Sequence, residues 1–334
     1  MYRRSFLCRW LCTLAIASMI SNLSLVQTPV QAQEPRTKIR ISNSAMSVTS
    51  LALLAAREWK LFHERGLEPE IILMSPAITV PAMISGEIDY FAGVGPGVAS
   101  ASLSGLPFRA VWVSSDKVSY SLVAHPKFKT LQDLKGKKIG VTGSLGATNH
   151  VSLVIALEKL GLAPKEFNIL ALPPNEMLRS LESGFLDAAS LNPPTLFMAH
   201  KKNFPSILDI GSLVEMPGGG LTVLAKDIKG KPDEVKRVIR SMQGAKEIMR
   251  KSKDKSVELM MRILKMDPES AAATYEVFLK TLSPDGVPTR AGMDNLVKSI
   301  QAQGRFTDKK PAFSDLADDR LAKEVAKELG YRVQ

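Results

Sequence analysis

The chain has almost no cysteine. Both of its cysteines, Cys8 and Cys12, lie near the N-terminus of a 334-residue sequence. The rest of the chain therefore offers no thiol nucleophile, no disulfide and no cysteine ligand for a metal. An exported protein of this size can do without disulfides, because a long chain buries a large core.

Histidine is also scarce. The four histidines are His63, His125, His150 and His200, and no two of them have the spacing of metal ligands on one helix. We therefore expect no metal and no cofactor. The formal net charge is +11, from 44 Lys and Arg against 33 Asp and Glu. Since no basic patch is interleaved with aromatic residues, we expect no nucleic-acid partner.

The N-terminal apolar run is too short for a membrane span followed by a stop signal. Three arginines precede this run, and residues 30–32 (VQA) fit a small-residue cleavage site. The pattern predicts a secretory signal peptide over 1–32 and a mature chain that begins at Gln33. An uncleaved anchor is the alternative. Either way, we expect the protein in the periplasm or another extracytoplasmic compartment.

One stretch, 133–149 (DLKGKKIGVTGSLGATN), indicates a strand, a small-residue loop and the start of a helix. Thr148 or Asn149 is the expected N-cap, and the helix is expected to run to about residue 160. Such a junction presents unpaired N–H groups to an anion or a polar ligand. An ordinary strand-to-helix turn is the alternative interpretation.

Three enzyme signatures fail in this stretch. A P-loop needs a lysine soon after Gly146, and none is there. A nucleophile elbow needs glycine two residues before Ser144, where Thr142 stands. Gly143 and Gly146 also lack the spacing of a dinucleotide fingerprint.

The first half of the chain alternates predicted strands (38–44, 70–74, 88–92 and 108–113) with helices, and the second half repeats this plan. KIRISNS at 38–44 parallels KKIGVTGS at 137–144, and ISGEIDYFAGVGP at 84–96 parallels ESGFLDAASLNPP at 182–194. The fold class expected is therefore α/β, with two similar lobes built on parallel sheets. Asp89 and Asp187, which correspond in the repeat, are expected to be structural turn residues rather than catalysts.

In parallel α/β sheets, ligands bind beyond the carboxyl ends of the strands. The strand-end loops expected are 42–49, 75–79, 93–98, 142–148, 172–176 and 191–195, and none contains Arg or Lys. The sequence therefore shows no Arg or Lys fork for a carboxylate, although N–H groups and hydroxyls can hold an anion. The predicted ligand-binding residues are Asn43, Ser44, Ser47, Ser75, Pro76, Gly95, Pro96, Ser114, Thr142, Ser144, Gly146, Ala147, Thr148 and Asn192.

Two segments must connect the lobes. Runs at 119–124 and 221–225 are the predicted crossing strands, and the three glycines at 218–220 are either a hinge or a flexible loop. The predicted domains are lobe 1 at 33–117, lobe 2 at 118–222, and a return to lobe 1 at 223–334. Helices are expected from residue 232, at 256–265, 268–282 and 289–303, and at 315–329.

Several motifs together carry a family resemblance: LFHERGLEPEI at 61–71, SGEIDYFAGVGP at 85–96, DLKGKKIGV at 133–141 and SGFLDAASLNPP at 183–194. With the predicted signal, the chain resembles the nitrate/sulfonate/taurine-type substrate-binding proteins of ABC importers, a group similar to the thiamine-pyrimidine-precursor synthases. The resemblance covers 38–303. It implies a type II periplasmic-binding fold, in which two lobes joined by two crossing strands clamp a ligand. Asn192 stands where many members have an acidic or aromatic residue.

The resemblance implies a monomeric solute receptor that delivers a small molecule to ABC permease subunits, and no enzyme activity. One alternative is an enzyme of the pyrimidine-precursor type, which would use a site rich in cysteine and histidine. Another is a periplasmic sensor that presents its ligand to a signalling partner. The sequence leaves the ligand open between a small anion and a neutral heteroaromatic or amide compound.

Overall fold

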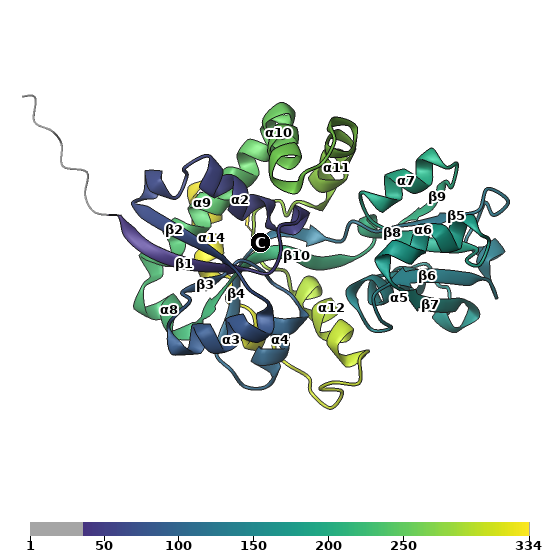
Figure 1. The fold of residues 1–334 in the computed structure, drawn as a ribbon. Coiled ribbons are helices and arrows are strands. Elements are labelled where there is room, and N and C mark those ends of the chain that lie inside the picture. The colour runs from purple at the N-terminus through teal and green to yellow at the C-terminus, as the bar shows by residue number, and fades with distance from the viewer. Residues whose placement is uncertain (1–35, 334) are drawn as a thin grey trace, which may run out of the picture. The chain divides into compact units, whose positions relative to one another are not determined.

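Ten strands form two separate sheets in this computed structural model, which describes residues 36–333 (Figure 1). The predicted signal peptide over 1–32 and the predicted start at Gln33 lie outside the described residues. None of the helices over 36–333 is long and apolar enough to cross a membrane.

The first sheet has the order β2-β1-β3-β10-β4. Strands β1, β2 and β3 are parallel, and β10 is antiparallel to both β3 and β4. The bounds are Thr37–Asn43 for β1, Leu67–Leu73 for β2, Tyr90–Phe91 for β3, Phe108–Lys117 for β4 and Glu215–Leu224 for β10.

The second sheet repeats the first, strand for strand. Its order is β7-β6-β8-β5-β9, in which β6, β7 and β8 are parallel and β5 is antiparallel to β8 and β9. The bounds are Lys138–Thr142 for β6, Asn168–Leu172 for β7, Ala188–Leu191 for β8, Ser121–Ala124 for β5 and Ser206–Asp209 for β9. The predicted repeat of two similar α/β lobes is confirmed. The expectation of parallel sheets was wrong, because β5 and β10 make each sheet mixed.

The aspartates that correspond in the repeat make the same contact in both lobes. The backbone N–H of Arg40 in β1 donates to Asp89 Oδ2 at 2.8 Å, and that of Lys138 in β6 donates to Asp187 Oδ2 at 3.1 Å. Each aspartate N–H in turn donates to the carbonyl of the same partner. Both carboxylates therefore satisfy a strand N–H, as expected of structural residues.

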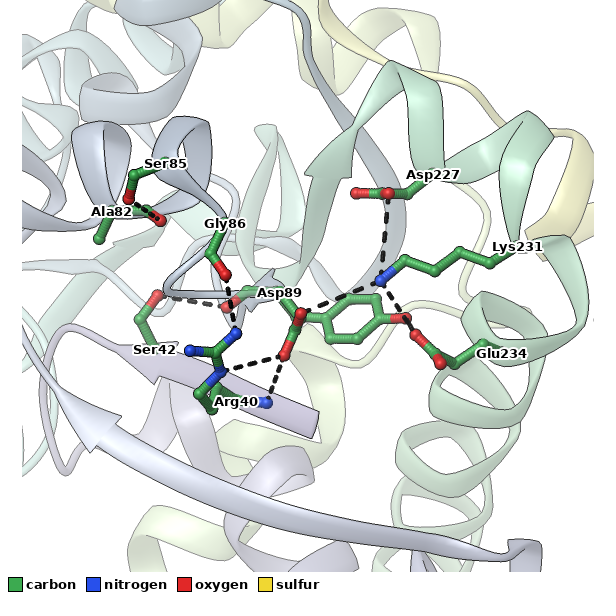
Figure 2. Close-up of polar contacts among 10 residues, drawn as sticks. Arg40, Ser42, Ala82, Ser85, Gly86, Asp89, Asp227, Lys231 and Glu234 are labelled. Atoms are coloured by element: carbon green, nitrogen blue, oxygen red, sulfur yellow. Dashed lines mark hydrogen bonds and ion pairs between the residues drawn. The ribbon is translucent and has the colours of Figure 1, made fainter. Parts of the chain in front are cut away.

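Figure 2 shows the surroundings of Asp89. The Arg40 guanidinium donates to the Gly86 carbonyl at 2.7 Å and lies 3.5 Å from the Asp89 carboxylate. On the other side, Lys231 Nζ lies 4.0 Å from Asp89 and 3.1 Å from Glu234 at the start of α9 (Pro232–Lys251). Glu234 also accepts a hydrogen bond from the Tyr90 hydroxyl at 2.6 Å. This network joins β1 and β3 to α9 by charge-assisted contacts.

Helices cover both faces of each sheet. Successive side chains of a strand point to opposite faces, so neighbouring residues of one strand pack against different helices. In the first sheet, Tyr90 packs in one cluster with the helices α2, α9, α10, α11 and α14, whereas Phe91 packs with α3 and α4. In the second, Leu122 packs with α5 and Val123 with α6 and α7. The bounds are α2 Leu51–Glu58, α3 Pro76–Ser85, α4 Pro96–Leu103, α5 Thr148–Lys159, α6 Pro174–Glu182, α7 Thr195–Lys201, α8 Ala225–Gly230, α9 Pro232–Lys251, α10 Lys253–Leu264, α11 Pro268–Thr281, α12 Arg290–Gln301, α13 Phe313–Leu316 and α14 Arg320–Glu328.

Several boundaries differ from the predictions. The sequence predicts a helix that is capped by Ser47 or Thr49 and runs to about residue 64, but α2 ends at Glu58, and Lys60 then adopts a left-handed backbone with φ of 58°. The last predicted helix, 315–329, is divided into α13 and α14 because Ala317 is extended. The strand predicted at 88–92 is only Tyr90–Phe91.

Strands β4 and β10 run side by side from Phe108↔Leu224 to Lys117↔Glu215 and lead into the second sheet. The two crossing strands are thus confirmed, but both were predicted too late in the chain: the run at 119–124 matches β5 of the second sheet instead of β4, and the run at 221–225 starts after the beginning of β10 at Glu215. The glycines at 218–220 form no loop; they lie inside β10. A Cβ on Gly219 would lie 2.2 Å from the Thr49 carbonyl oxygen, so glycine permits the close approach of η1 (Val48–Ser50). The proposed domain boundaries themselves stay a prediction.

Candidate functional site

A cavity of about 540 Å³ lies at the carboxyl ends of the parallel strands of both sheets. Its walls come from strand-end loops, from the crossing segments and from the C-terminal helices. Its lining residues are Met46, Ser47, Val48, Thr49, Val94, Gly95, Pro96, Ser115, Lys117, Val118, Ser119, Tyr120, Thr148, Asn192, Pro193, Pro194, Pro217, Gly218, Leu264, Met266, Thr274, Val277, Phe278 and Thr281.

Four of the six predicted loops line this cavity. The first sheet contributes Ser47, Gly95 and Pro96, from the loops after β1 and β3. The second contributes Thr148 and Asn192, from the corresponding loops after β6 and β8. The repeat thus brings equivalent loops of the two lobes to one cavity.

The loops 75–79 and 172–176 do not line the cavity. They follow β2 and β7, which are the edge strands of their sheets and so end away from its centre. Ser75 is exposed, and Pro76 packs against the backbone at Gly97. The sequence could not show this, because it does not reveal the order of strands within a sheet.

Other predicted residues shape the loops without lining the cavity. Asn43 is buried, and its Nδ2 donates to the Ala45 carbonyl at 2.8 Å; Ser50 Oγ donates to the same carbonyl at 2.9 Å. These bonds hold the loop that carries Ser47 and Thr49. Ser44 is exposed outside the cavity, and Ser114 is buried in β4, where its neighbour Ser115 faces the cavity instead.

The predicted cap of α5 was wrong. Ala147 is the N-cap and Thr148 is the first helical residue. Asn149 is 1% exposed, and its Nδ2 donates to Thr142 Oγ1 at 2.8 Å and to the Ser190 carbonyl at 3.0 Å. Asn149 therefore ties the 142–148 loop to β8 rather than capping the helix.

The rest of the 142–148 loop lies beside the cavity rather than along it. Ser144 is exposed, and Gly146 is held by two hydrogen bonds: its N–H donates to His150 Nδ1 at 2.9 Å and its carbonyl accepts from Gln303 Nε2 at 3.1 Å. Ser144, Gly146 and Ala147 are not among the lining residues. A contact between these residues and a ligand stays a prediction.

Sequence reasoning missed the wall formed by α10 and α11. Leu264 is the last residue of α10, Met266 lies in the turn after it, and Thr274, Val277, Phe278 and Thr281 belong to α11. An apolar helix stripe has the same period whether it faces a core or a cavity, so the pattern could not separate the two. The crossing residues 117–120 were also missed, although the predicted hinge lay nearby.

Lys117 is the only charged side chain among the lining residues, and it is exposed at the end of β4. Burial raises the pKa of Tyr120, so its hydroxyl is protonated at neutral pH and can donate a hydrogen bond. Behind the wall, burial raises the pKa of Asp116, whose Oδ1 lacks a hydrogen-bond partner in the described chain. Residues 36–333 contain no group of three His, Cys, Asp or Glu side chains that could hold a metal.

Two known proteins are similar to this chain in sequence, and one solved structure is similar to it in fold. A Brucella abortus (strain 2308) protein named "Putative binding protein" is 27% identical over 227 residues, covering 66% of this chain and 69% of that protein. A Bacillus subtilis (strain 168) protein named "Putative aliphatic sulfonates-binding protein" is 24% identical over 295 residues, covering 84% and 86%. The crystal structure of the periplasmic aliphatic sulphonate binding protein SsuA from Escherichia coli superimposes with a TM-score of 0.69 at 17% identity, covering 86% of this chain and 99% of SsuA.

The SsuA comparison gives the fold: two α/β lobes of the periplasmic-binding type, as the sequence resemblance implied. The family model described as "NMT1/THI5 like" matches residues 48–255, which include most of the cavity-lining loop residues of both sheets. The chain therefore belongs to the NMT1/THI5-like family.

Proposed function

We propose that this chain is an extracytoplasmic solute-binding protein that captures a small polar or anionic molecule between its lobes and delivers it to an ABC permease. The observation that carries the proposal is the cavity lined by equivalent strand-end loops of both sheets. A ligand held by Ser47 or Thr49 on one side and by Thr148 or Asn192 on the other would contact both lobes at once.

The donors around the cavity suit a ligand that accepts hydrogen bonds. Thr148 is in the first turn of α5, where N–H groups lack partners within the helix and the dipole favours negative charge. Thr148 and Asn192 line the cavity, so their hydroxyl and amide groups are within reach of a ligand. Names of the relatives, which refer to binding and to sulfonates, support the same proposal.

The lining residues argue for binding rather than catalysis. They include no His, Cys, Asp, Glu or Arg. The side chains that most often act as general acids and bases are therefore missing from this wall, and burial raises the pKa of Tyr120, so its hydroxyl stays protonated at neutral pH and is not available as a base. Lys117 is the one remaining ionisable group, and it is exposed.

The protein purified without denaturation is expected to carry one small molecule per chain, because a preformed cavity with unpaired donors retains its ligand. Native mass spectrometry gives the stoichiometry, and extraction after unfolding identifies the compound. The control is the same extraction from protein that was unfolded, washed and refolded, which should return no compound until the solute is added back. Conversion of the added solute would indicate an enzyme, and failure of every preparation to bind a solute would contradict the proposal.

A further inference from the structure

One wall of the cavity is apolar and belongs to α10 and α11. Leu264 and Met266 come from the end of α10 and the turn after it, and Val277 and Phe278 come from α11. Phe278 is 4% exposed and part of the core that the two helices share, so this wall is fixed by packing. Two threonines of α11 also line it: Thr281 Oγ1 donates to the Phe278 carbonyl at 2.8 Å, whereas the buried Oγ1 of Thr274 has no hydrogen-bond partner in the described chain.

The strand-end loops carry the complementary chemistry. Ser47 and Thr49 of the first lobe and Thr148 and Asn192 of the second supply hydroxyl and amide groups. The hydroxyl and amide groups at the loops stand beside apolar loop residues such as Met46 and Val48, and the wall at α10 and α11 is mostly apolar.

This arrangement has consequences for what can bind. A small inorganic anion gives up its hydration on binding and needs donors around it, which the apolar wall does not supply. The only cation of the lining, Lys117, is exposed. A cavity of about 540 Å³ has the volume typical of sites for organic molecules of moderate size.

We propose that the ligand is amphiphilic, with a hydrogen-bond-accepting end of at most one negative charge at the strand-end loops and an aromatic or branched hydrocarbon body on the wall formed by Met266, Val277 and Phe278. This inference rests on the proposed function and names the class of solute. The apolar body contributes affinity because its surface leaves water on binding.

A series of monocarboxylates with one head group tests the apolar part. Acetate, benzoate and 2-naphthoate, titrated by calorimetry or NMR, should bind in increasing order of affinity. We expect the affinity to rise about tenfold or more from acetate to 2-naphthoate, since each added ring buries apolar area. Equal affinity across the series, or no binding by any member, would overturn the inference.

Met266→Gln changes the wall at nearly constant volume. Met266 is half-buried, so the variant should fold, and we expect the affinity for 2-naphthoate to fall about fivefold or more with acetate unchanged. Met198→Gln is the matched control, because Met198 is 49% exposed on α7 and does not line the cavity. Unchanged 2-naphthoate affinity in Met266→Gln would count against the inference. A retained ligand that proves to be a small hydrophilic solute would overturn it too while supporting the proposed function, whereas failure to bind any solute would contradict the proposed function itself.

Discussion

Replacing Gly95 with leucine is expected to abolish most ligand binding while leaving the protein folded. Gly95 lines the cavity, and a Cβ built on it meets no atom within 4 Å. Its φ of −155° is extended backbone that any residue adopts, so the substitution brings no strain. The new side chain fills space that the solute would occupy. Since overpacking costs ~1–3 kcal/mol, the affinity should fall roughly five- to hundredfold.

The matched control for this variant is Gly230→Leu. Gly230 is exposed at the end of α8, and a Cβ there also meets nothing within 4 Å. Both variants should melt close to the parent protein, with at most ~1 kcal/mol lost in Gly95→Leu because Gly95 is the N-cap of α4. Titration with the retained solute separates them: only Gly95→Leu should bind weakly. Equal affinity in both variants would mean that the solute does not use this cavity.

Replacing Lys246 with methionine is expected to raise the free energy of unfolding at pH 6. Lys246 in α9 is fully buried, and its Nζ donates to the Ser283 carbonyl at 2.8 Å. Arg250 Nη2 donates to the same carbonyl at 2.9 Å, so that oxygen keeps a donor in the variant. A charge removed from water at such a site costs stability, and methionine has similar volume without the charge.

The effect of Lys246 should depend on pH. Burial, assisted by the nearby Arg250, lowers the pKa of Lys246 to about 7, while Glu247, Asp285 and Asp116 act in the opposite direction. Between pH 7 and the ordinary lysine pKa, the unfolded chain binds more protons than the folded one, so the parent protein gains stability as the pH rises. The variant lacks this gain. Its advantage should therefore shrink between pH 6 and pH 9 by roughly 2–3 kcal/mol, at about 1.4 kcal/mol per pKa unit.

Urea unfolding at pH 6 and pH 9 measures this difference. Lys251→Met is the control, because Lys251 is exposed at the end of the same helix and should change stability little at either pH. If Lys246→Met were less stable than the parent at pH 6, or if its advantage were the same at both pH values, the buried lysine would be a net stabilising partner instead.

The two-lobed plan could be predicted because it is encoded twice. Arg40 and Lys138, each paired through its backbone with the aspartate just before a neighbouring strand, occupy equivalent positions in the two halves. Local patterns that recur in the same order predict recurring structure, and the strand orders of the two sheets match. The antiparallel direction of β5 and β10 was harder to predict, because alternation of apolar residues does not indicate the direction in which a strand pairs.

The site was only partly predictable. Loops that follow central strands supply Ser47, Gly95, Thr148 and Asn192, as the rule for parallel sheets expects. Met266, in the turn between α10 and α11, and Phe278 of α11 come from far along the chain and meet the loops only through tertiary packing. No local pattern carries that information. The buried Thr274 hydroxyl, which has no hydrogen-bond partner in the described chain, interrupts an apolar helix stripe, and a polar residue at such a position indicates that the stripe can face a cavity.

A crystal structure of the protein with its retained solute tests the central claim most directly. We predict density for one molecule in the cavity, with its accepting end within hydrogen-bond distance of Ser47 or Thr49 from the first lobe and of Thr148 or Asn192 from the second. A solute bound outside this cavity, or one that contacts the strand-end loops of a single lobe only, would contradict the account.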